Sequence, residues 1–427
     1  MPVHPDRIPS LVFANSRGEI LDYSGMQMAG SSCGHFSLPD KEDLIELPEG
    51  SELFVLPGRL PVGIEHETGE PALLDSNPFD NDQPQAVAAF MAPAHTALYS
   101  AAYKSKDNAP ILPLFAYTAV GWADNRFWVA GFRSDSDCRQ DANQFNQQAI
   151  NRKTNRLLKE YRNNRLVQHL GKCCLTYGCP AARNYFLGRW EAPLPSSPAC
   201  NASCIGCISL QPSGCCPATQ DRIQFVPRPA EIGEIAIPHL EKAPKPIVSF
   251  GQGCEGEPLL QAKTLEKSIT LIRSKTTRGT INLNTNASLP QAVERLVHAG
   301  LDSIRVSLNS ARPEYYEKYY RPRGFSFADM QDSITVVKKA GRHVSLNYFI
   351  LPGFTDDRAE FAKLCELIES SRPDLIQLRN LNLDPEQYIK ALQYKSEDSS
   401  IGIRNWLAGL KENFPLLKFG YFNPPIH

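Results

Sequence analysis

The sequence has little that would mark a secreted or membrane protein. Met1–Ser10 contains Pro, His, Asp and Arg but no apolar run, which argues against a secretory signal peptide. The longest apolar stretches, such as Ala86–Ala92 and Val248–Phe250, are far shorter than the span of a bilayer. We therefore expect a cytoplasmic protein that has no membrane partner.

A charge excess of either sign is also missing. The chain has 45 Lys and Arg against 46 Asp and Glu, a formal net charge of −1, so there is no overall attraction to nucleic acid or to an anionic membrane. Disorder is excluded by composition, because 42% of the 427 residues are hydrophobic and only 21% are charged. This length and composition predict about two to three domains with a sizeable core.

The sequence is rich in cysteine, and the cysteines are unevenly distributed along it. Of the 12 cysteines, Cys33, Cys138 and Cys365 are scattered, and the others lie within one short part of the chain. In a large chain without a signal peptide, such a cluster indicates metal or redox chemistry rather than disulfides. The clustered positions are Cys173, Cys174, Cys179, Cys200, Cys204, Cys207, Cys215, Cys216 and Cys254.

Patterning along the chain predicts four parts. The first is mostly β, because short apolar runs alternate with turn signals such as Asn15–Gly18 and Ala123–Asn125. Its fold and role are not apparent from the sequence. The predicted parts are an N-terminal mostly-β domain at 1–140, a basic helix with a cysteine-containing linker at 141–188, an α/β domain at 189–395 and a C-terminal extension at 396–427.

The second part is predicted to hold one long helix over Gln144–Leu170, because its apolar residues recur at helical spacing. The opposite face is basic, which is typical of a solvated surface and is also compatible with a binding surface for an acidic partner or RNA. The basic residues are Arg152, Lys153, Arg156, Lys159, Arg162 and Arg165.

From about Arg189 onward, strand-like and helix-like segments alternate. Such alternation predicts a parallel sheet with right-handed crossovers, and a strand ahead of the cysteines makes a six-stranded open barrel. The ligand site is then expected at the carboxyl ends of the strands. The predicted strands are Pro246–Phe250, Thr280–Asn284, Ser303–Leu308, His343–Ile350 and Asp374–Leu378, and the predicted helices are Lys263–Lys275, Pro290–Ala299, Phe327–Ala340 and Arg358–Ser370.

The spacing C-x3-C-x2-C of Cys200, Cys204 and Cys207 is the motif that carries chemistry. Three thiolates at this spacing can converge on one metal centre, and three ligands on a four-iron cube leave one iron open. A structural zinc ion would need a fourth ligand, which Cys215 or Cys216 would supply. The triplet alone therefore leaves iron–sulfur and zinc both open.

Four later segments add to the triplet. Gly256-Glu257-Pro258 follows the second strand, Asn284 and Asn286 end the third, Ser307 and Asn309 end the fourth, and Ile350 ends the fifth. In this order the five motifs resemble the radical S-adenosylmethionine (radical SAM) superfamily over about Arg189–Ala391. The resemblance implies a partial (β/α)6 TIM-like barrel, here preceded by the mostly-β domain and the basic linker helix.

The resemblance also implies a cofactor set. The three cysteines of the triplet would hold a 4Fe–4S cluster, and the four later segments would bind S-adenosylmethionine, with Ile350 or Leu351 packed on adenine. The sequence departs from the family pattern in three places: Gly206 stands where an aromatic residue is common, Glu255 where a glycine is common and Ala287 where a glycine is common.

The activity that the resemblance implies is oxygen-sensitive radical chemistry. A reductant such as a flavodoxin or ferredoxin would supply one electron, S-adenosylmethionine would be cleaved, and a 5′-deoxyadenosyl radical would abstract hydrogen from an unknown small molecule, peptide or RNA. No catalytic acid or base is identifiable. The candidates for substrate contact are Asn347, Arg379, Asn380 and Asn382, which are equally compatible with ordinary hydrogen-bonded loop positions.

The remaining cysteines raise the hypothesis of a second metal centre, either an auxiliary cluster or zinc. Its candidate ligands are Cys173, Cys174, Cys179, Cys215 and Cys216, which otherwise are buried thiols. Cys254 lies beside the expected S-adenosylmethionine site, where a thiol would donate hydrogen or bind a cluster; a turn position is the favoured interpretation.

Two other classes of function compete with the enzyme. A zinc-stabilised nucleic-acid-binding protein would use the triplet, Cys215 and the basic helix, and it predicts salt-sensitive RNA binding. It does not account for the ordered segments at the strand ends. A non-catalytic barrel that acts as a scaffold would not need the intact triplet.

Overall fold

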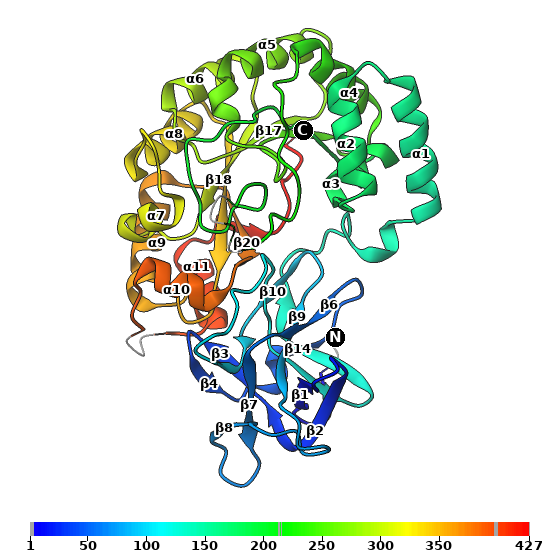
Figure 1. Ribbon diagram of the computed structural model, residues 1–427. Coiled ribbons are helices and arrows are strands. Elements are labelled where there is room, and N and C mark those ends of the chain that lie inside the picture. Colours follow the sequence, from blue (N-terminus) through cyan, green and yellow to red (C-terminus); the bar gives the residue numbers. More distant parts are fainter. Residues whose placement is uncertain (1–3, 212–213, 215, 397–399, 427) are drawn as a thin grey trace. The chain divides into compact units, whose positions relative to one another are not determined.

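The computed structural model describes residues 4–211, 214, 216–396 and 400–426. The chain divides into two compact units, each built from segments that are far apart in the sequence (Figure 1). The domain boundaries predicted at residues 140, 188 and 395 stay predictions. Unit 1 comprises Met1–Ser136, Phe349–Cys365 and Leu378–Pro415, and unit 2 comprises Asp137–Tyr348, Glu366–Gln377 and Leu416–His427.

Unit 1 is mainly antiparallel β, as the sequence predicts for its N-terminal part. An eleven-stranded sheet has the central order β10-β14-β13-β1-β2-β7-β12, and a small sheet has the order β11-β3-β4. Alternating apolar side chains such as Val12, Val87 and Val129 form its core. The strands are β1 (Ser10–Ala14), β2 (Ile20–Met28), β3 (Gly30–Ser32), β4 (His35–Ser37), β5 (Leu44–Glu46), β6 (Glu52–Leu56), β7 (Arg59–Glu65), β8 (Pro71–Leu73), β9 (Gln85–Phe90), β10 (His95–Ala97), β11 (Ser100–Ala101), β12 (Tyr103–Ser105), β13 (Val120–Ala123) and β14 (Arg126–Arg133).

Both predicted hairpins are confirmed. Strands β1 and β2 pair antiparallel, and the Asn15 side chain accepts hydrogen bonds from the backbone N–H groups of Arg17 and Glu19 in the turn. Strands β13 and β14 also pair antiparallel, and Asp124 and Asn125 both have positive φ, as the tightest hairpin turn requires.

Two helices from late in the chain belong to unit 1, α10 (Pro385–Leu392) and α11 (Ile403–Asn413). A buried ion pair ties the start of α10 to the β region, because the Arg59 guanidinium donates to the Asp384 carboxylate at 2.7 Å. The same carboxylate accepts from the N–H of Leu112 and caps α10. Unit 1 therefore has a charged centre on which several segments converge.

Unit 2 begins with three helices, and here the prediction of one helix over Gln144–Leu170 was wrong. The chain forms α1 (Gln147–Glu160) and α2 (Arg165–Leu175), with a break between them, and then α3 (Pro180–Leu187). Asn164 causes the break: its side chain accepts from the N–H groups at the first turn of α2, and its amide donates to the Glu231 carbonyl oxygen. Apolar periodicity continues across the break, so periodicity alone did not reveal it.

The rest of unit 2 is built on a curled parallel sheet of order β15-β16-β17-β18-β19-β20-β21. The six predicted strands are present, and a seventh, β21, was not predicted. Strands β16 and β17 are buried throughout, as expected for a parallel sheet covered by helices. The strands are β15 (Glu191–Pro193), β16 (Ile247–Phe250), β17 (Thr280–Thr285), β18 (Ser303–Leu308), β19 (His343–Ile350), β20 (Leu375–Asn380) and β21 (Lys418–Gly420).

The four predicted crossover helices are confirmed to within two residues at each end, and α6 ends at Gly300 in the left-handed conformation. Helix α4 was missed, although Pro229 at its first turn and Glu231 three residues after Arg228 are start signals. The helices are α4 (Pro229–Lys242), α5 (Ala262–Arg273), α6 (Pro290–Ala299), α7 (Pro313–Tyr320), α8 (Phe327–Lys339) and α9 (Arg358–Ser371), and the short 3-10 segments are Lys41–Asp43, Ala142–Gln144 and Pro258–Gln261.

Across the described residues, no helix combines the length and the apolar character that crossing a bilayer requires.

Candidate cluster and cofactor site

A cavity of about 230 Å³ opens at the carboxyl ends of β16, β17 and β18 in unit 2, where the parallel sheet was expected to bind its ligand. It brings together the cysteine triplet and most of the residues that the sequence predicted for the cofactor. Of the predicted residues, it is lined by Cys200, Cys204, Cys207, Gly256, Glu257, Pro258, Asn284, Asn286 and Ser307.

The loop that carries the triplet is held by the end of α7. The N–H of Ser203 donates to the Tyr320 carbonyl oxygen at 2.9 Å, and the N–H of Ile205 donates to the Tyr319 carbonyl oxygen at 3.1 Å. The guanidinium of Arg323 donates to the Cys200 carbonyl oxygen at 2.7 Å. These contacts fix the backbone between the cysteines, so their thiols are aimed at the cavity by the fold.

The arrangement of the three thiols bears on which metal centre they could hold. Among the described residues, His169, Cys173 and Cys254 place three potential ligand atoms within 4.8 Å of one another, and Cys200, Cys204 and Cys207 do not form such a compact group. A zinc ion holds its sulfur ligands about 3.8 Å apart, because its bonds to them are about 2.3 Å long. Three thiols that line one cavity fit a polynuclear cluster, in which each thiolate binds a different iron atom.

The electrostatics of the triplet also fit a metal centre. Burial raises the pKa of the Cys200 thiol, and burial together with the neighbouring thiols raises the pKa of Cys204 well above its ordinary value. Thiolates at these positions need a positive partner, which a bound metal centre provides. The Arg222 guanidinium adds a protein charge, because it lies 3.4 Å from the Cys207 sulfur and donates to Ser209 as well.

Gly256 is required where the loop after β16 meets the cysteine loop. An added Cβ would lie 2.0 Å from the Ala199 carbonyl oxygen, which is closer than a Cβ atom can approach another heavy atom without a shift of the structure. The N–H of Gly256 donates to the Ser197 carbonyl oxygen at 2.7 Å, and the N–H of Glu257 donates to Ala199 at 2.8 Å. The two loops therefore pair through their backbones directly beside Cys200.

Glu255 replaces the glycine that is common at this position in the family, and the structure gives its carboxylate a definite role. One oxygen accepts from the N–H and hydroxyl of Ser196 and the N–H of Ser197; the other accepts from the N–H groups of Gly251 and Gln252. Burial raises the pKa of Glu255 to about 7, and these bonds oppose the rise. Glu255 thus joins the β16 loop to the segment that precedes the cysteines.

Glu257 connects the same loop to the end of β17. Its carboxylate accepts from the Thr285 hydroxyl at 2.5 Å and from the Asn286 N–H at 2.9 Å. Burial raises the pKa of Glu257 to about 7. The Asn286 amide in turn donates to the Asn201 side chain at 2.9 Å, which lies next to Cys200. The predicted β17 residues therefore order the site as well as lining it.

Strand β18 presents alternate side chains to the cavity, and these include one that the sequence reasoning missed. Ser307 lines the cavity as predicted, and Arg305, two residues earlier on the same face, lines it too. Asn309 and Ile350 are not among the lining residues; Asn309 is buried and donates to the Tyr315 carbonyl oxygen. The period of two along the strand was present in the sequence and would have pointed to Arg305.

Asn380, a candidate for substrate contact, has a structural role in unit 1. Its amide oxygen accepts from the Ala97 N–H at 2.9 Å, and its amide N–H donates to the His95 carbonyl oxygen at 3.0 Å. Arg379, Asn382 and Asn347 are not among the residues that line the cluster cavity. Their assignment to substrate contact stays a prediction.

The remaining cysteines separate into different surroundings. Cys173 lies 3.6 Å from His169 and hydrogen-bonds Cys254; that bond lowers the pKa of Cys173 and raises the pKa of Cys254. Cys174 lies 3.4 Å from the Thr154 hydroxyl instead. Cys216 is buried, and Cys215 lies outside the described residues.

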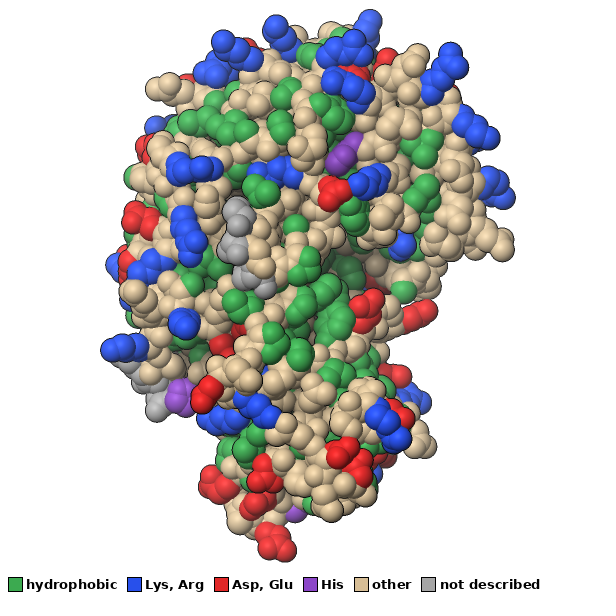
Figure 2. All heavy atoms as spheres, in the orientation of Figure 1, with side chains coloured by type: hydrophobic (Ala, Val, Ile, Leu, Met, Phe, Trp, Pro, Cys, Tyr) green, Lys and Arg blue, Asp and Glu red, His purple; other side chains and the backbone are tan. Residues whose placement is uncertain are grey.

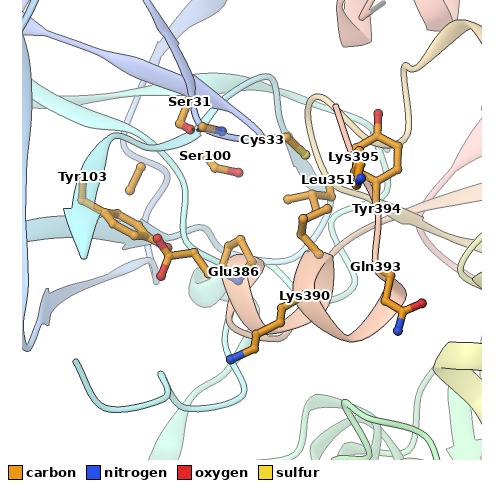
Figure 3. A pocket seen from close by; sticks show the side chains of 14 residues that line it. Ser31, Cys33, Ser100, Tyr103, Leu351, Glu386, Lys390, Gln393, Tyr394 and Lys395 are labelled. Carbon is orange, nitrogen blue, oxygen red and sulfur yellow. Dashed lines mark hydrogen bonds between the residues drawn. The ribbon is translucent and has the colours of Figure 1, made fainter. Parts of the chain in front are cut away.

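A second cavity, of about 450 Å³, lies within unit 1. Figure 3 shows its wall formed by the β region around Ser31 and Ser100 on one side and by α10 with Glu386 and Lys390 on the other. Leu351, the alternative to Ile350 for packing on adenine, lines this cavity. Its size suits a small organic ligand or a peptide side chain.

Comparisons with known proteins give a family for part of the chain. Residues 194–365 match the sequence model of the radical SAM superfamily. No curated protein matches the chain. Similar solved structures include methylornithine synthase, at 14% identity and a TM-score of 0.39 with 62% of this chain and 78% of that chain covered.

Two further solved structures are similar at the same level. The FeFe-hydrogenase maturase HydG from Carboxydothermus hydrogenoformans has 15% identity and a TM-score of 0.33, with 64% of this chain and 74% of that chain covered. SuiB from Streptococcus suis, bound to S-adenosylmethionine, has 14% identity and a TM-score of 0.37, with 57% and 54% covered.

The matched segment includes the cysteine loop and strands β16 to β19, and it is a radical SAM domain. The chain thus contains a radical SAM domain over residues 194–365, and the predicted family, enzyme class and half-barrel fold are confirmed for this part of the chain. The family implies that a 4Fe–4S cluster and S-adenosylmethionine are bound, whereas it specifies neither a substrate nor a second metal centre.

Proposed function

We propose that Cys200, Cys204 and Cys207 hold the 4Fe–4S cluster and that S-adenosylmethionine binds in the cavity beside them. The chemistry that the bound pair supplies is reductive cleavage of S-adenosylmethionine to methionine and a 5′-deoxyadenosyl radical, which takes a hydrogen atom from the substrate. The observation that supports this most strongly is that the triplet and three strand-end segments line one cavity.

The protein's part is to hold and orient the cofactor. The paired backbones of the cysteine loop and the Gly256 loop bring bare main chain to the cavity wall, where the amino group of S-adenosylmethionine needs acceptors. Glu255 and Glu257, which also line the cavity, fix that wall through buried hydrogen bonds. A wall fixed in this way keeps its shape when the cofactor binds.

Arg305 and Ser307 are the groups that fit the carboxylate and ribose of S-adenosylmethionine. Arg305 supplies a positive charge with several N–H donors, and Ser307 supplies a hydroxyl from the same strand face. Asn284 and Asn286 add amides at the end of the neighbouring strand β17.

Tyr320 takes over the aromatic contact that Gly206 lacks. Its ring lines the cavity from α7, next to the cysteine loop that its carbonyl group holds. We assign adenine packing to this ring, because an aromatic face gives a flat base both apolar contact and a preferred stacking geometry. Ile350 stays a prediction for the same contact.

The external partners are a reductant, such as a flavodoxin or ferredoxin, and a substrate that is a small molecule, a peptide or an RNA. Figure 2 shows Lys and Arg side chains along the outer edge of α1, and Arg152, Arg156 and Lys159 are exposed there. This basic face favours an acidic partner such as a reduced flavodoxin or RNA. A cytoplasmic location suits an oxygen-sensitive cluster.

The test is an anaerobic turnover assay. Protein reconstituted with iron and sulfide, then given dithionite and S-adenosylmethionine, should release 5′-deoxyadenosine. A Cys204→Ala variant should lose both cluster absorbance and product, whereas the exposed Cys138→Ala should keep both. A colourless zinc protein without product would overturn the proposal and restore the nucleic-acid-binding alternative, which does not account for the strand-end residues that line the same cavity as the triplet.

A further inference from the structure

His169, Cys173 and Cys254 form a compact group within unit 2, apart from the cysteine triplet. Their potential ligand atoms all lie within 4.8 Å of one another, and the imidazole Nε2 of His169 lies 3.6 Å from the sulfur of Cys173. His169 and Cys173 are four residues apart on α2, so one helix face carries both side chains. Cys254 reaches them from the loop that follows β16.

We propose that His169, Cys173 and Cys254 bind a zinc ion that joins α2 to the loop of the S-adenosylmethionine cavity. The proposal deepens the sequence hypothesis of a second centre, whose candidates were Cys173, Cys174, Cys179, Cys215 and Cys216. It keeps Cys173 and adds His169 and Cys254. It rests on the geometry of unit 2 and not on the proposed radical chemistry.

The ligand types and spacing fit zinc. Zinc takes Cys sulfur at about 2.3 Å and His nitrogen at about 2.0–2.1 Å in a tetrahedral arrangement, which puts neighbouring ligand atoms about 3.5–3.8 Å apart. The His169–Cys173 separation of 3.6 Å lies in that range. A 4Fe–4S cluster needs wider spacing, because each thiolate binds a different iron atom of the cube.

Charge and burial agree with this assignment. The side chains of Cys173 and Cys254 are 1% and 5% exposed. Two thiolates and a neutral imidazole balance the charge of Zn²⁺, so the group can be buried without leaving a net charge in an apolar region.

A fourth coordination position is available. Cys173 and Cys254 line a small cavity of about 20 Å³ that is also lined by Cys179 and Gln252. A space of this volume is large enough for one water molecule, which would complete the tetrahedron, and the Cys179 thiol is the protein alternative.

A bound zinc ion would influence the active site through the backbone of the loop that contains Cys254. Cys254 is followed directly by Glu255, Gly256 and Glu257, whose contacts build the wall of the cluster cavity. Tying Cys254 to α2 restrains this loop. Zinc binding would therefore stabilise the loop without taking part in electron transfer, since Zn²⁺ has no redox chemistry.

The decisive experiment separates this site from the cluster. A variant with Cys200, Cys204 and Cys207 all changed to Ala, expressed with zinc in the medium, should retain about one zinc per chain by elemental analysis. Adding Cys173→Ala or Cys254→Ala should lower the affinity for zinc by more than about tenfold, since even the loss of an outer-shell partner costs about that much, and most of the zinc should be lost. The matched control is Cys174→Ala, which removes the adjacent buried thiol and should keep the zinc.

X-ray absorption at the zinc edge provides a measurement that does not depend on the added substitutions. It should show two or three sulfur neighbours together with nitrogen. A first shell of oxygen and nitrogen only, or the absence of zinc with a Cys173–Cys254 disulfide detected by mass spectrometry, would overturn the proposal. Zinc that persists when Cys173 is removed would overturn it as well. None of these results depends on whether 5′-deoxyadenosine is formed.

Discussion

Replacing Gly256 by alanine tests whether the site needs the close approach of two backbones. The alanine Cβ would lie 2.0 Å from the Ala199 carbonyl oxygen, and such contacts are essentially never shorter than 3.0 Å. The peptide ahead of Cys200 must therefore move by at least about 1 Å, the difference between these two distances. Gly256 is not among the glycines with positive φ, so only space is lacking.

That movement would break two backbone hydrogen bonds, from Gly256 to Ser197 and from Glu257 to Ala199. At roughly 0.5–1.5 kcal/mol each, their loss lowers the free energy of unfolding by about 1–3 kcal/mol. A displacement of about 1 Å in a reacting site costs about 100-fold in rate. We expect a lower melting temperature, incomplete iron uptake and about 100-fold slower release of 5′-deoxyadenosine.

Gly253→Ala is the matched control, because it lies in the same loop and also lines the cavity. Its added Cβ meets only the ends of the Gln220 and Ile208 side chains, which can rotate away. The control should keep its iron and most of its activity. A Gly256→Ala enzyme with wild-type iron content, melting temperature and product rate would refute the argument that the paired backbones form the site.

Arg305→Met should weaken S-adenosylmethionine binding to the reconstituted enzyme by about tenfold or more in equilibrium dialysis, because a charge-assisted bond is lost; unchanged binding would remove Arg305 from the site. Asp384→Ala should lower the free energy of unfolding by about 3–5 kcal/mol in a urea titration, because Arg59 is left as a buried unpaired charge; a loss below about 1 kcal/mol would contradict that view. Arg165 hydrogen bonds lower the pKa of Glu231 to about 2, so this carboxylate should stabilise the fold above about pH 4.5 and lose its effect as pH falls through about 2. The free energy of unfolding of the wild type should exceed that of Glu231→Gln by about 2 kcal/mol at pH 7, a figure reduced because Arg165 is half-exposed, and the difference should vanish near pH 2. A difference that does not change with pH would count against the ion pair.

Much of the half-barrel was predictable from the sequence. Segments such as Ser303–Leu308 and Pro290–Ala299 were placed to the residue, because hydrophobic period and end signals such as Gly300 are local properties. The cysteine triplet and Gly256-Glu257-Pro258 were also recognisable, since their residue types and spacing are close in the chain. The prediction of a single helix over Gln144–Leu170 failed, because Asn164 begins a new helix partly through its hydrogen bond to Glu231, which lies on the distant helix α4.

What the sequence by itself determined is thus what neighbouring residues dictate: the cysteine triplet and its spacing, the alternation of strands and helices, and the edge of the sheet at which the cavity opens. The tertiary structure alone decided which distant side chains converge. Arg305 joins the cavity through strand pairing, and Cys254 meets His169 and Cys173 across 81 or more residues. The physical reason is that local patterns reflect the backbone's own geometry, whereas such groupings arise only when apolar faces pack and bring separate segments together.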